Sequence, residues 1–242
     1  MIVTTSFENA PARDVGVTGQ VYRLWEFVGR APVRGTYVEG NEANDNALPQ
    51  GFLVQQPPGS ITRPHFHETN QFQVFVGGGG HFGKRPAAPL TVQYASGHTP
   101  YGPISANDEG LLYYTLRQRW DPGAKYMPAM RDRLVRGRQR QHLVPVDATL
   151  LQSTGTHTLI APHEDGLAAS LSVVEPNTSL TLDSFDEGGG QYHIVVGGTM
   201  LFEGEAYGLH ACQFADPDCA PYSIQAGADG LSLLVLRFPF LN

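Results

Sequence analysis

Two histidines separated by a single residue, His65 and His67, are the side chains in this sequence with the clearest chemical potential. In an extended strand the side chains at i and i+2 point to the same face, so both imidazoles can face one cavity. Gln71 keeps the same parity and would bring a neutral amide oxygen to that face. Imidazole suits Fe, Mn, Ni, Cu and Zn, so the pattern predicts a divalent transition metal held by His65, His67 and Gln71.

The strand that would carry the histidine pair belongs to an internal repeat. Residues 54–117 align with 174–237 at a constant offset of 120 residues, and 14 of the 64 aligned positions are identical. A repeat of this length predicts two units of the same architecture. The second copy has Phe185 and Glu187 at the two histidine positions, so only the first unit is predicted to hold a metal. Gln71 is retained as Gln191, which also allows a purely structural role for this glutamine.

Short apolar runs bounded by Gly, Pro and other turn residues predict an all-β chain. The expected strands are an additional one at 21–28, then 51–56, 71–76, 90–95 and 110–117 in the first copy and 170–175, 191–196, 211–215 and 230–237 in the second. Four glycines at 77–80 follow one of these strands and are expected to form a tight hairpin, because such turns need positive φ. The predicted units are 1–125 and 146–242, joined by a connector at 126–145 with a helix at 127–141.

Two segments resemble motifs of the cupin superfamily. The first family motif is a glycine, HxH, an acidic residue and a later glycine, and it resembles 59–78, where Gln71 replaces the acidic residue. The second, roughly PxGxxH, resembles PYGPIS at 100–105, with Ser105 at the histidine position. The resemblance covers both copies and implies a bicupin of two tandem jelly-roll barrels, with a metal site in the first and a degenerate site in the second. Family sites commonly use three histidines and a carboxylate, so a fourth ligand would have to come from His81 or His98.

The same cavity would bind a small molecule. Gln73, Phe75, Tyr101 and Ser105 are the candidates for contact with it, although filling of the barrel is the alternative for Phe75. A metal-dependent enzyme of dioxygenase-like or Lewis-acid type is one hypothesis. The alternatives are a histidine pair that is hydrogen-bonded without metal, a non-catalytic small-molecule-binding or sensing protein, and a structural bicupin that forms homodimers or higher oligomers through sheet edges.

The composition of the chain restricts which classes of partner and which cellular compartment we expect. The formal net charge of -7 argues against a general nucleic-acid-binding protein. Residues 117–140 contain eight of the 16 Lys and Arg residues, and this stretch is expected to be a solvated connector, with an anion-binding or subunit-contacting surface as the alternative. With two cysteines, no basic-then-apolar start and no apolar run near ~20 residues, the expectation is a soluble cytoplasmic protein without membrane or nucleic-acid partners.

Overall fold

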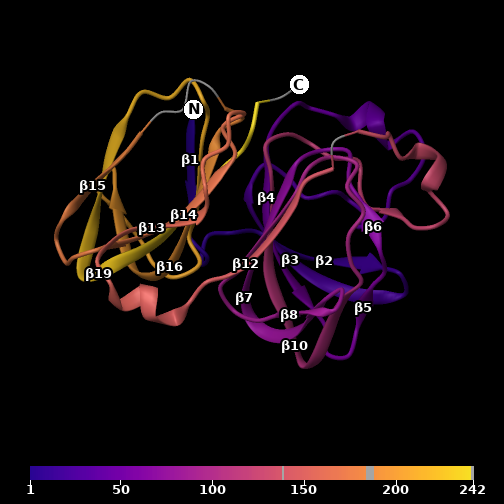
Figure 1. Cartoon of the computed structure of the whole chain (residues 1–242), viewed down its shortest axis with the longest axis horizontal. Coiled ribbons are helices and arrows are strands. Elements are labelled where there is room, and N and C mark those ends of the chain that lie inside the picture. The colour runs from indigo at the N-terminus through magenta and orange to yellow at the C-terminus, as the bar shows by residue number, and fades with distance from the viewer. Residues whose placement is uncertain (138, 184–187, 241–242) are drawn as a thin grey trace. The chain divides into compact units, whose positions relative to one another are not determined.

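The chain divides into two compact units in the computed structural model, which describes residues 1–137, 139–183 and 188–240. The N-terminal unit is Pro11–Pro145, and the C-terminal unit is Val146–Asn242 together with Met1–Ala10 (Figure 1). Antiparallel strands dominate both units, and the helical segments are three short 3-10 turns at Asn41–Asn44, Arg131–Arg133 and Ala148–Gln152 within the described residues. The prediction of an all-β jelly-roll fold is confirmed. Among the described residues, none of the helices combines the length and apolar character needed to span a membrane.

The N-terminal unit is built on a nine-stranded sheet in the order β12-β9-β7-β10-β4-β3-β2, with β5 and β8 paired to β10 and β7. Its strands are β2 (Ala12–Val17), β3 (Gln20–Val28), β4 (Gln50–Gln56), β5 (Ile61–Thr62), β7 (Gln71–Phe82), β8 (Arg85–Ala87), β9 (Thr91–Ala95), β10 (Ile104–Arg117) and β12 (Gln141–Pro145). A separate ribbon pairs β6 (His65–Phe66) with β11 (Lys125–Tyr126). This short ribbon carries the first histidine of the predicted site.

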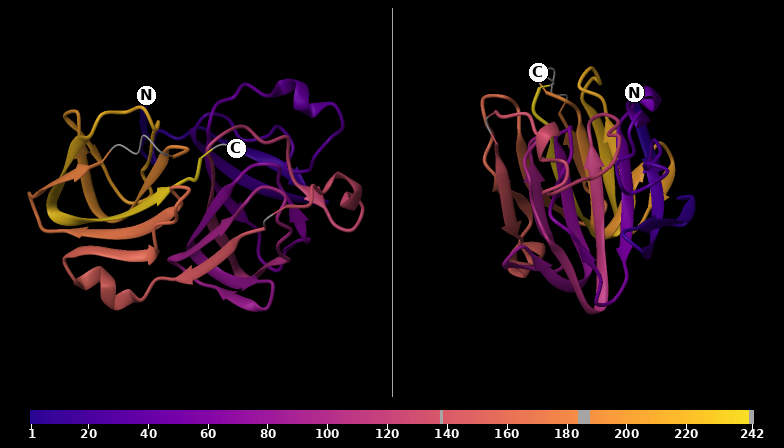
Figure 2. Two further views of the ribbon diagram at one scale, coloured as in Figure 1. Left: turned by 45° about the horizontal axis from the view of Figure 1, so that its top comes forward. Right: turned by 90° about the vertical axis from the view of Figure 1, so that its right-hand side faces the viewer.

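The C-terminal unit repeats this order with β1-β18-β16-β19-β14-β13, and β15 and β17 pair with β19 and β16. Its strands are β1 (Ile2–Thr5), β13 (Gly155–Ile160), β14 (Ala168–Val174), β15 (Ser179–Leu182), β16 (Gln191–Phe202), β17 (Glu205–Tyr207), β18 (Cys212–Ala215) and β19 (Tyr222–Arg237). Figure 2 shows the long yellow β19 bending along this unit. The nine predicted strands all correspond to strands of the structure.

The predicted bounds of the units differ from the structure at two places. β1 pairs with β18, from Ile2 opposite Ala215 to Thr5 opposite Cys212, so the first residues belong to the C-terminal unit. The indigo β1 among the orange and yellow strands of Figure 1 makes this visible. Likewise β12 pairs with β9, and the whole segment 126–145 belongs to the N-terminal unit instead of a connector between units.

The helix predicted at 127–141 is wrong over the described residues. A 3-10 turn at Arg131–Arg133 and the strand β12 occupy this stretch, and Arg138 lies outside the described residues. The pairing with β9 begins only at Gln141, at the end of this stretch, so it explains the extended chain there and not in the preceding residues.

The expected hairpin at 77–80 is also wrong, because these glycines lie within β7. Their role is close approach to the neighbouring strand. A Cβ at Gly78 would lie 2.1 Å from the carbonyl oxygen of Gly110, and one at Gly80 would lie 2.0 Å from that of Ser105. Gly198 repeats the first contact in the C-terminal unit, 2.1 Å from Gly230 O, with the same positive φ. The glycines therefore allow β7 and β16 to press against β10 and β19.

Candidate functional site

A cavity of about 80 Å³ lies in the N-terminal unit, which is room for several waters or a small organic group. One part of its wall is apolar and aromatic, with side chains from β2, β3, β4 and β10 such as Val17, Tyr22, Phe52, Val54 and Tyr113. The other part is polar and is formed by His65, His67, Gln71, Gln73, Tyr101, Thr115 and Arg117. A cavity with an apolar wall and a few converging polar groups is the usual form of a small-molecule site.

His65 is held as a neutral imidazole with one nitrogen directed to Tyr101. Its Nδ1 donates to the carbonyl oxygen of Arg63 at 2.8 Å, so Nε2 carries the lone pair and accepts from the Tyr101 hydroxyl at 3.1 Å. Burial, and then the neighbouring His67, lower the pKa of His65 to about 3. The ring is therefore uncharged at neutral pH, and its tautomer is fixed by the backbone.

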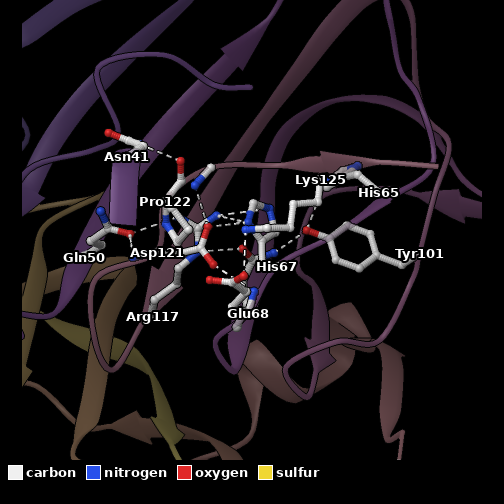
Figure 3. A network of polar contacts seen from close by, with 12 residues as sticks. Asn41, Gln50, His65, His67, Glu68, Tyr101, Arg117, Asp121, Pro122 and Lys125 are labelled. Atoms are coloured by element: carbon white, nitrogen blue, oxygen red, sulfur yellow. Dashed lines mark hydrogen bonds and ion pairs between the residues drawn. The ribbon is translucent and has the colours of Figure 1, made fainter. Parts of the chain in front are cut away.

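His67 is oriented by a fully buried carboxylate. Its Nδ1 donates to Asp121 Oδ1 at 2.7 Å, and Asp121 also accepts from the backbone N–H groups of Glu68 and Gly123, each at 2.9 Å. Burial, and then the Arg117 charge, lower the pKa of His67. Burial alone would raise the pKa of Asp121, but His67, Arg117 and the Gly123 N–H together hold it well below its usual range. The pair is thus a neutral imidazole donating to a carboxylate (Figure 3).

Arg117 joins the other polar side chains into one network. Its Nε donates to Gln71 Oε1 at 2.9 Å, its Nη1 donates to Gln50 Oε1 at 3.0 Å, and its Nη2 lies 3.2 Å from both ring nitrogens of His67. Gln71 in turn donates from Nε2 to the Tyr101 hydroxyl at 2.6 Å. A continuous set of hydrogen bonds therefore runs from the Asp121 carboxylate through Arg117 and Gln71 to His65.

The structure brings five of the predicted site residues to this cavity: His65, His67, Gln71, Gln73 and Tyr101. Phe75 instead packs in the core, with its ring 5.4 Å from that of Tyr113. Ser105 pairs with His81 on β7 and does not line the cavity, because its neighbour Ile104 takes the inward direction. Adjacent strand residues point to opposite faces, so the PxGxxH comparison placed the wrong residue inside.

Neither candidate for a fourth ligand reaches the cavity. His81 is exposed on β7 opposite Ser105. His98 accepts at Nδ1 from the backbone N–H of Val135 at 3.3 Å, and its ring lies 5.7 Å from that of Phe66. The prediction that one of them completes a ligand set is wrong for this arrangement.

Three functional residues were missed or misread in the sequence. Asp121 lies in an Asp-Pro-Gly segment beyond the repeat, where an exposed turn is the ordinary interpretation. Arg117 and Lys125 were placed in a solvated connector, yet they are 2% and 0% exposed. Lys125 Nζ lies 2.9 Å from Glu68 Oε1 and 4.0 Å from the centroid of the Tyr37 ring. One feature of the sequence could have indicated a structural role for Arg117: the second copy keeps this arginine, as Arg237, at the end of the equivalent strand.

The residues present fit only part of the predicted metal site. His65 and His67 both hold the proton on Nδ1 and keep the lone pair on Nε2, which is the form that a metal-binding histidine takes, but these Nε2 atoms already contact the Tyr101 hydroxyl and Arg117 Nη2. Gln71 does not fit, because its oxygen already accepts from Arg117 and the guanidinium charge lies beside His67. Among the described residues, no group of three or more His, Cys, Asp and Glu side chains could hold a metal ion.

The C-terminal unit lacks this arrangement at the positions that are described. His193 donates from Nδ1 to Gln213 Oε1 at 2.9 Å, and Gln213 donates to Thr4 Oγ1 at 2.8 Å. Burial lowers the pKa of His193 to about 4. Phe185 and Glu187, the counterparts of the histidine pair, lie outside the described residues.

No family model and no curated protein matches the sequence. Solved structures do match the chain over nearly its whole length. The bacterial pirin YhhW from Escherichia coli, in complex with nickel(II), has a TM-score of 0.60 and 14% identity, with 100% of both chains covered. Quercetin 2,3-dioxygenase from Acinetobacter baumannii has a TM-score of 0.53 and 14% identity, with 99% of this chain and 79% of that one covered. A single-residue variant of the oxalate decarboxylase of Bacillus subtilis has a TM-score of 0.57 and 12% identity, with 98% and 77% covered. At these identities the likeness is one of fold.

Proposed function

Because the chain has the cupin fold, we propose that the N-terminal unit binds a small organic molecule in its central cavity. The observation that carries this proposal is the cavity itself, in which an apolar and aromatic wall faces the polar network of His65, Gln71, Tyr101 and Arg117. The two surfaces would bind the body of a ligand and its polar group, respectively. This is the small-molecule-binding alternative among the hypotheses drawn from the sequence.

The protonation states of the polar side chains are fixed before a ligand binds. Burial raises the pKa of Tyr101 above its usual value, so its hydroxyl remains protonated at neutral pH. His65 and His67 are neutral for the same reason, and Arg117 is the charged side chain among the described residues that line the cavity. Fixed tautomers and few rotatable groups reduce the ordering that binding requires.

A cavity-filling substitution tests the proposal. The probes are phenol, benzamide, benzoate and acetophenone, observed by saturation-transfer NMR in EDTA. We expect at least one to bind the wild type and to lose about tenfold or more in affinity with Val54→Phe, because the larger ring occupies the apolar wall. Val174→Phe is the matched control, since Val174 is the same residue at the same repeat position and packs against the C-terminal core.

The result against the proposal is that no probe binds the wild type, or that both variants affect binding equally. Inserting a large side chain destabilises a core by about 1–3 kcal/mol, so circular dichroism must first establish that Val54→Phe is folded. Val54→Leu, which adds one methylene, gives a weaker version of the same test.

A second candidate function is binding of a divalent metal by His65 and His67, as in a metal-dependent enzyme of dioxygenase-like type. The observation that favours it is the tautomer of both rings, in which the Arg63 carbonyl and Asp121 hold the Nδ1 protons and leave the lone pairs on Nε2. The nickel(II) complex of the pirin with the same fold is consistent with this candidate. The charge of Arg117 opposes it, since a divalent cation would lie close to a buried guanidinium.

Metal analysis separates the two candidates. If a metal is resident, protein purified without an affinity tag contains about one equivalent of Fe, Mn, Ni, Cu or Zn, and the His65→Ala/His67→Ala variant contains none. We also expect Arg117→Met to bind Ni²⁺ at least about tenfold more tightly than the wild type, because it removes the opposing charge. A wild type that takes up none of these metals on titration rules out the second candidate and leaves the first intact.

A further inference from the structure

Two glutamines beside the cavity have buried polar atoms without partners. Gln73 lines the cavity and is 3% exposed, and Gln93 is fully buried. Gln73 Oε1 and both side-chain polar atoms of Gln93 have no hydrogen-bond partner among the described residues. Each unsatisfied buried polar atom opposes folding because it has lost its hydrogen bonds to water, so three together are a substantial cost. Native proteins retain such a feature where another molecule satisfies it.

The two side chains lie next to each other on the inner face of the sheet. Gln73 on β7 is directly opposite Gln93 on β9, and residues opposite each other across antiparallel strands share a face. Leu143 on β12 is opposite Gln93 in turn and packs against the core of the N-terminal unit. Gln93 therefore faces inward beside Gln73, which lines the cavity, although Gln93 is not itself among the described residues that line it.

The repeat supplies an internal comparison for this pair. Gln213 holds the position of Gln93 in the second copy, and His193 holds that of Gln73. There the glutamine is satisfied: Oε1 accepts from His193 Nδ1 at 2.9 Å and from the Tyr222 hydroxyl at 2.6 Å, and Nε2 donates to Thr4. The same residue at the same place in the fold thus completes a network in one unit and is left open in the other. His193 Nε2 is also buried without a partner among the described residues of the second copy, so the two copies differ at the glutamine position.

We infer that Gln73 and Gln93 form a subsite for a primary carboxamide, or for a planar group with the same hydrogen-bonding pattern. The fully buried atoms of this pair without a partner in the described part of the chain are two acceptors, Gln73 Oε1 and Gln93 Oε1, and one donor group, Gln93 Nε2. A primary amide offers two N–H donors and one carbonyl acceptor, which matches this set. A carboxylate offers acceptors alone and would leave both glutamine oxygens unsatisfied. This inference rests on the proposed function, because it names the ligand group that the same cavity takes.

The first test compares stability in the two units. Gln93→Met replaces an unsatisfied amide with an apolar side chain of similar length, so the melting temperature is expected to stay the same or rise. Gln213→Met in the second copy removes three satisfied hydrogen bonds and is expected to lower it by several degrees. If Gln93→Met lowers the melting temperature as much as Gln213→Met does, Gln93 belongs to a structural network and the inference is overturned.

The second test uses three probes of nearly the same shape: benzamide, acetophenone and benzoate. In the wild type, benzamide is expected to bind about tenfold more tightly than acetophenone, which lacks the N–H donors, and more tightly than benzoate. Gln93→Met is expected to remove this preference for benzamide while acetophenone binding stays the same. A preference that survives in Gln93→Met overturns the inference.

The outcomes separate the inference from the proposed function. Equal binding of benzamide and acetophenone, or tightest binding of benzoate, overturns the carboxamide subsite and leaves a small-molecule cavity. If benzoate binds most tightly, the charge of Arg117 selects the ligand. If none of the probes binds, the result contradicts both the carboxamide subsite and the proposed small-molecule function. Ordered water at the two glutamines that benzamide does not displace also overturns the inference.

Discussion

Asp121→Asn is expected to lower the free energy of unfolding of the N-terminal unit by about 3–5 kcal/mol, the largest effect of any single substitution considered. The carboxylate is fully buried and accepts hydrogen bonds from His67 and from the backbone N–H groups of Glu68 and Gly123. An asparagine keeps the shape but has one acceptor oxygen, so its amide group would place N–H against N–H. The substitution also removes the negative charge that stabilises the nearby guanidinium of Arg117.

Urea unfolding followed by circular dichroism measures this loss, and Asp14→Asn is the control. Asp14 pairs with Arg23 at 3.2 Å on the surface, where both side chains are at least half exposed. Exposed ion pairs contribute little, so the control is expected to change stability by less than about 1 kcal/mol. Equal urea midpoints for the two variants would mean that Asp121 is not the anchor of the network.

Acidification is expected to destabilise both units steeply below about pH 6.5. The pKa of His65 is about 3 and that of His193 about 4 in the folded chain, whereas an unfolded histidine has a pKa of about 6.5. Between these values the unfolded chain binds protons that the folded chain does not. Stability is therefore fully present above about pH 6.5 and is lost as pH falls, at roughly 1 kcal/mol per pH unit for each buried histidine. The Asp121 carboxyl, whose pKa is lowered, loses its contribution only at still lower pH.

Urea midpoints between pH 8 and pH 5, recorded in EDTA, check the sign and the slope. His193→Gln removes the titrating group in the C-terminal unit and leaves an amide that can still donate to Gln213. We expect it to flatten the pH dependence of that unit while His65 maintains the slope of the other. A midpoint that is constant over this range, or a slope that His193→Gln leaves unchanged, contradicts the prediction.

The fold was predictable because it depends on a regular pattern. Strand periodicity and the 120-residue repeat together located the strands of both units, and the same alternation explains why His65 and His67 meet at one cavity. The partner of β1 was beyond this reasoning, because four residues at one end of the chain give no indication of a pairing near the other. The role of the glycines at 77–80 also depended on how closely two strands approach.

The polar network around the histidines was only partly predictable. Tyr101 was expected at the cavity, and its hydroxyl contacts both His65 and Gln71. Asp121 is 54 residues from His67 and shares no strand with it, so only the folded chain brings them together. Burial of Arg117 likewise depends on acceptors supplied by separate strands, including Gln50 on β4. Residue spacing within one strand can indicate a site, but the groups that orient its side chains come from elsewhere.

The pairing of β1 with β18 determines which unit can complete its sheet first during synthesis. Residues 2–5 are synthesised before the N-terminal unit, whereas the strand with which they pair, Cys212–Ala215, is synthesised after it. Domains generally fold as they are synthesised, so the sheet of Pro11–Pro145 can close while β1 still has bare N–H and C=O groups. During that interval the unpaired β1 is open to pairing with the β18 of another chain. Exchange of β1 between copies is therefore expected to begin on polysomes, where several chains are synthesised close together.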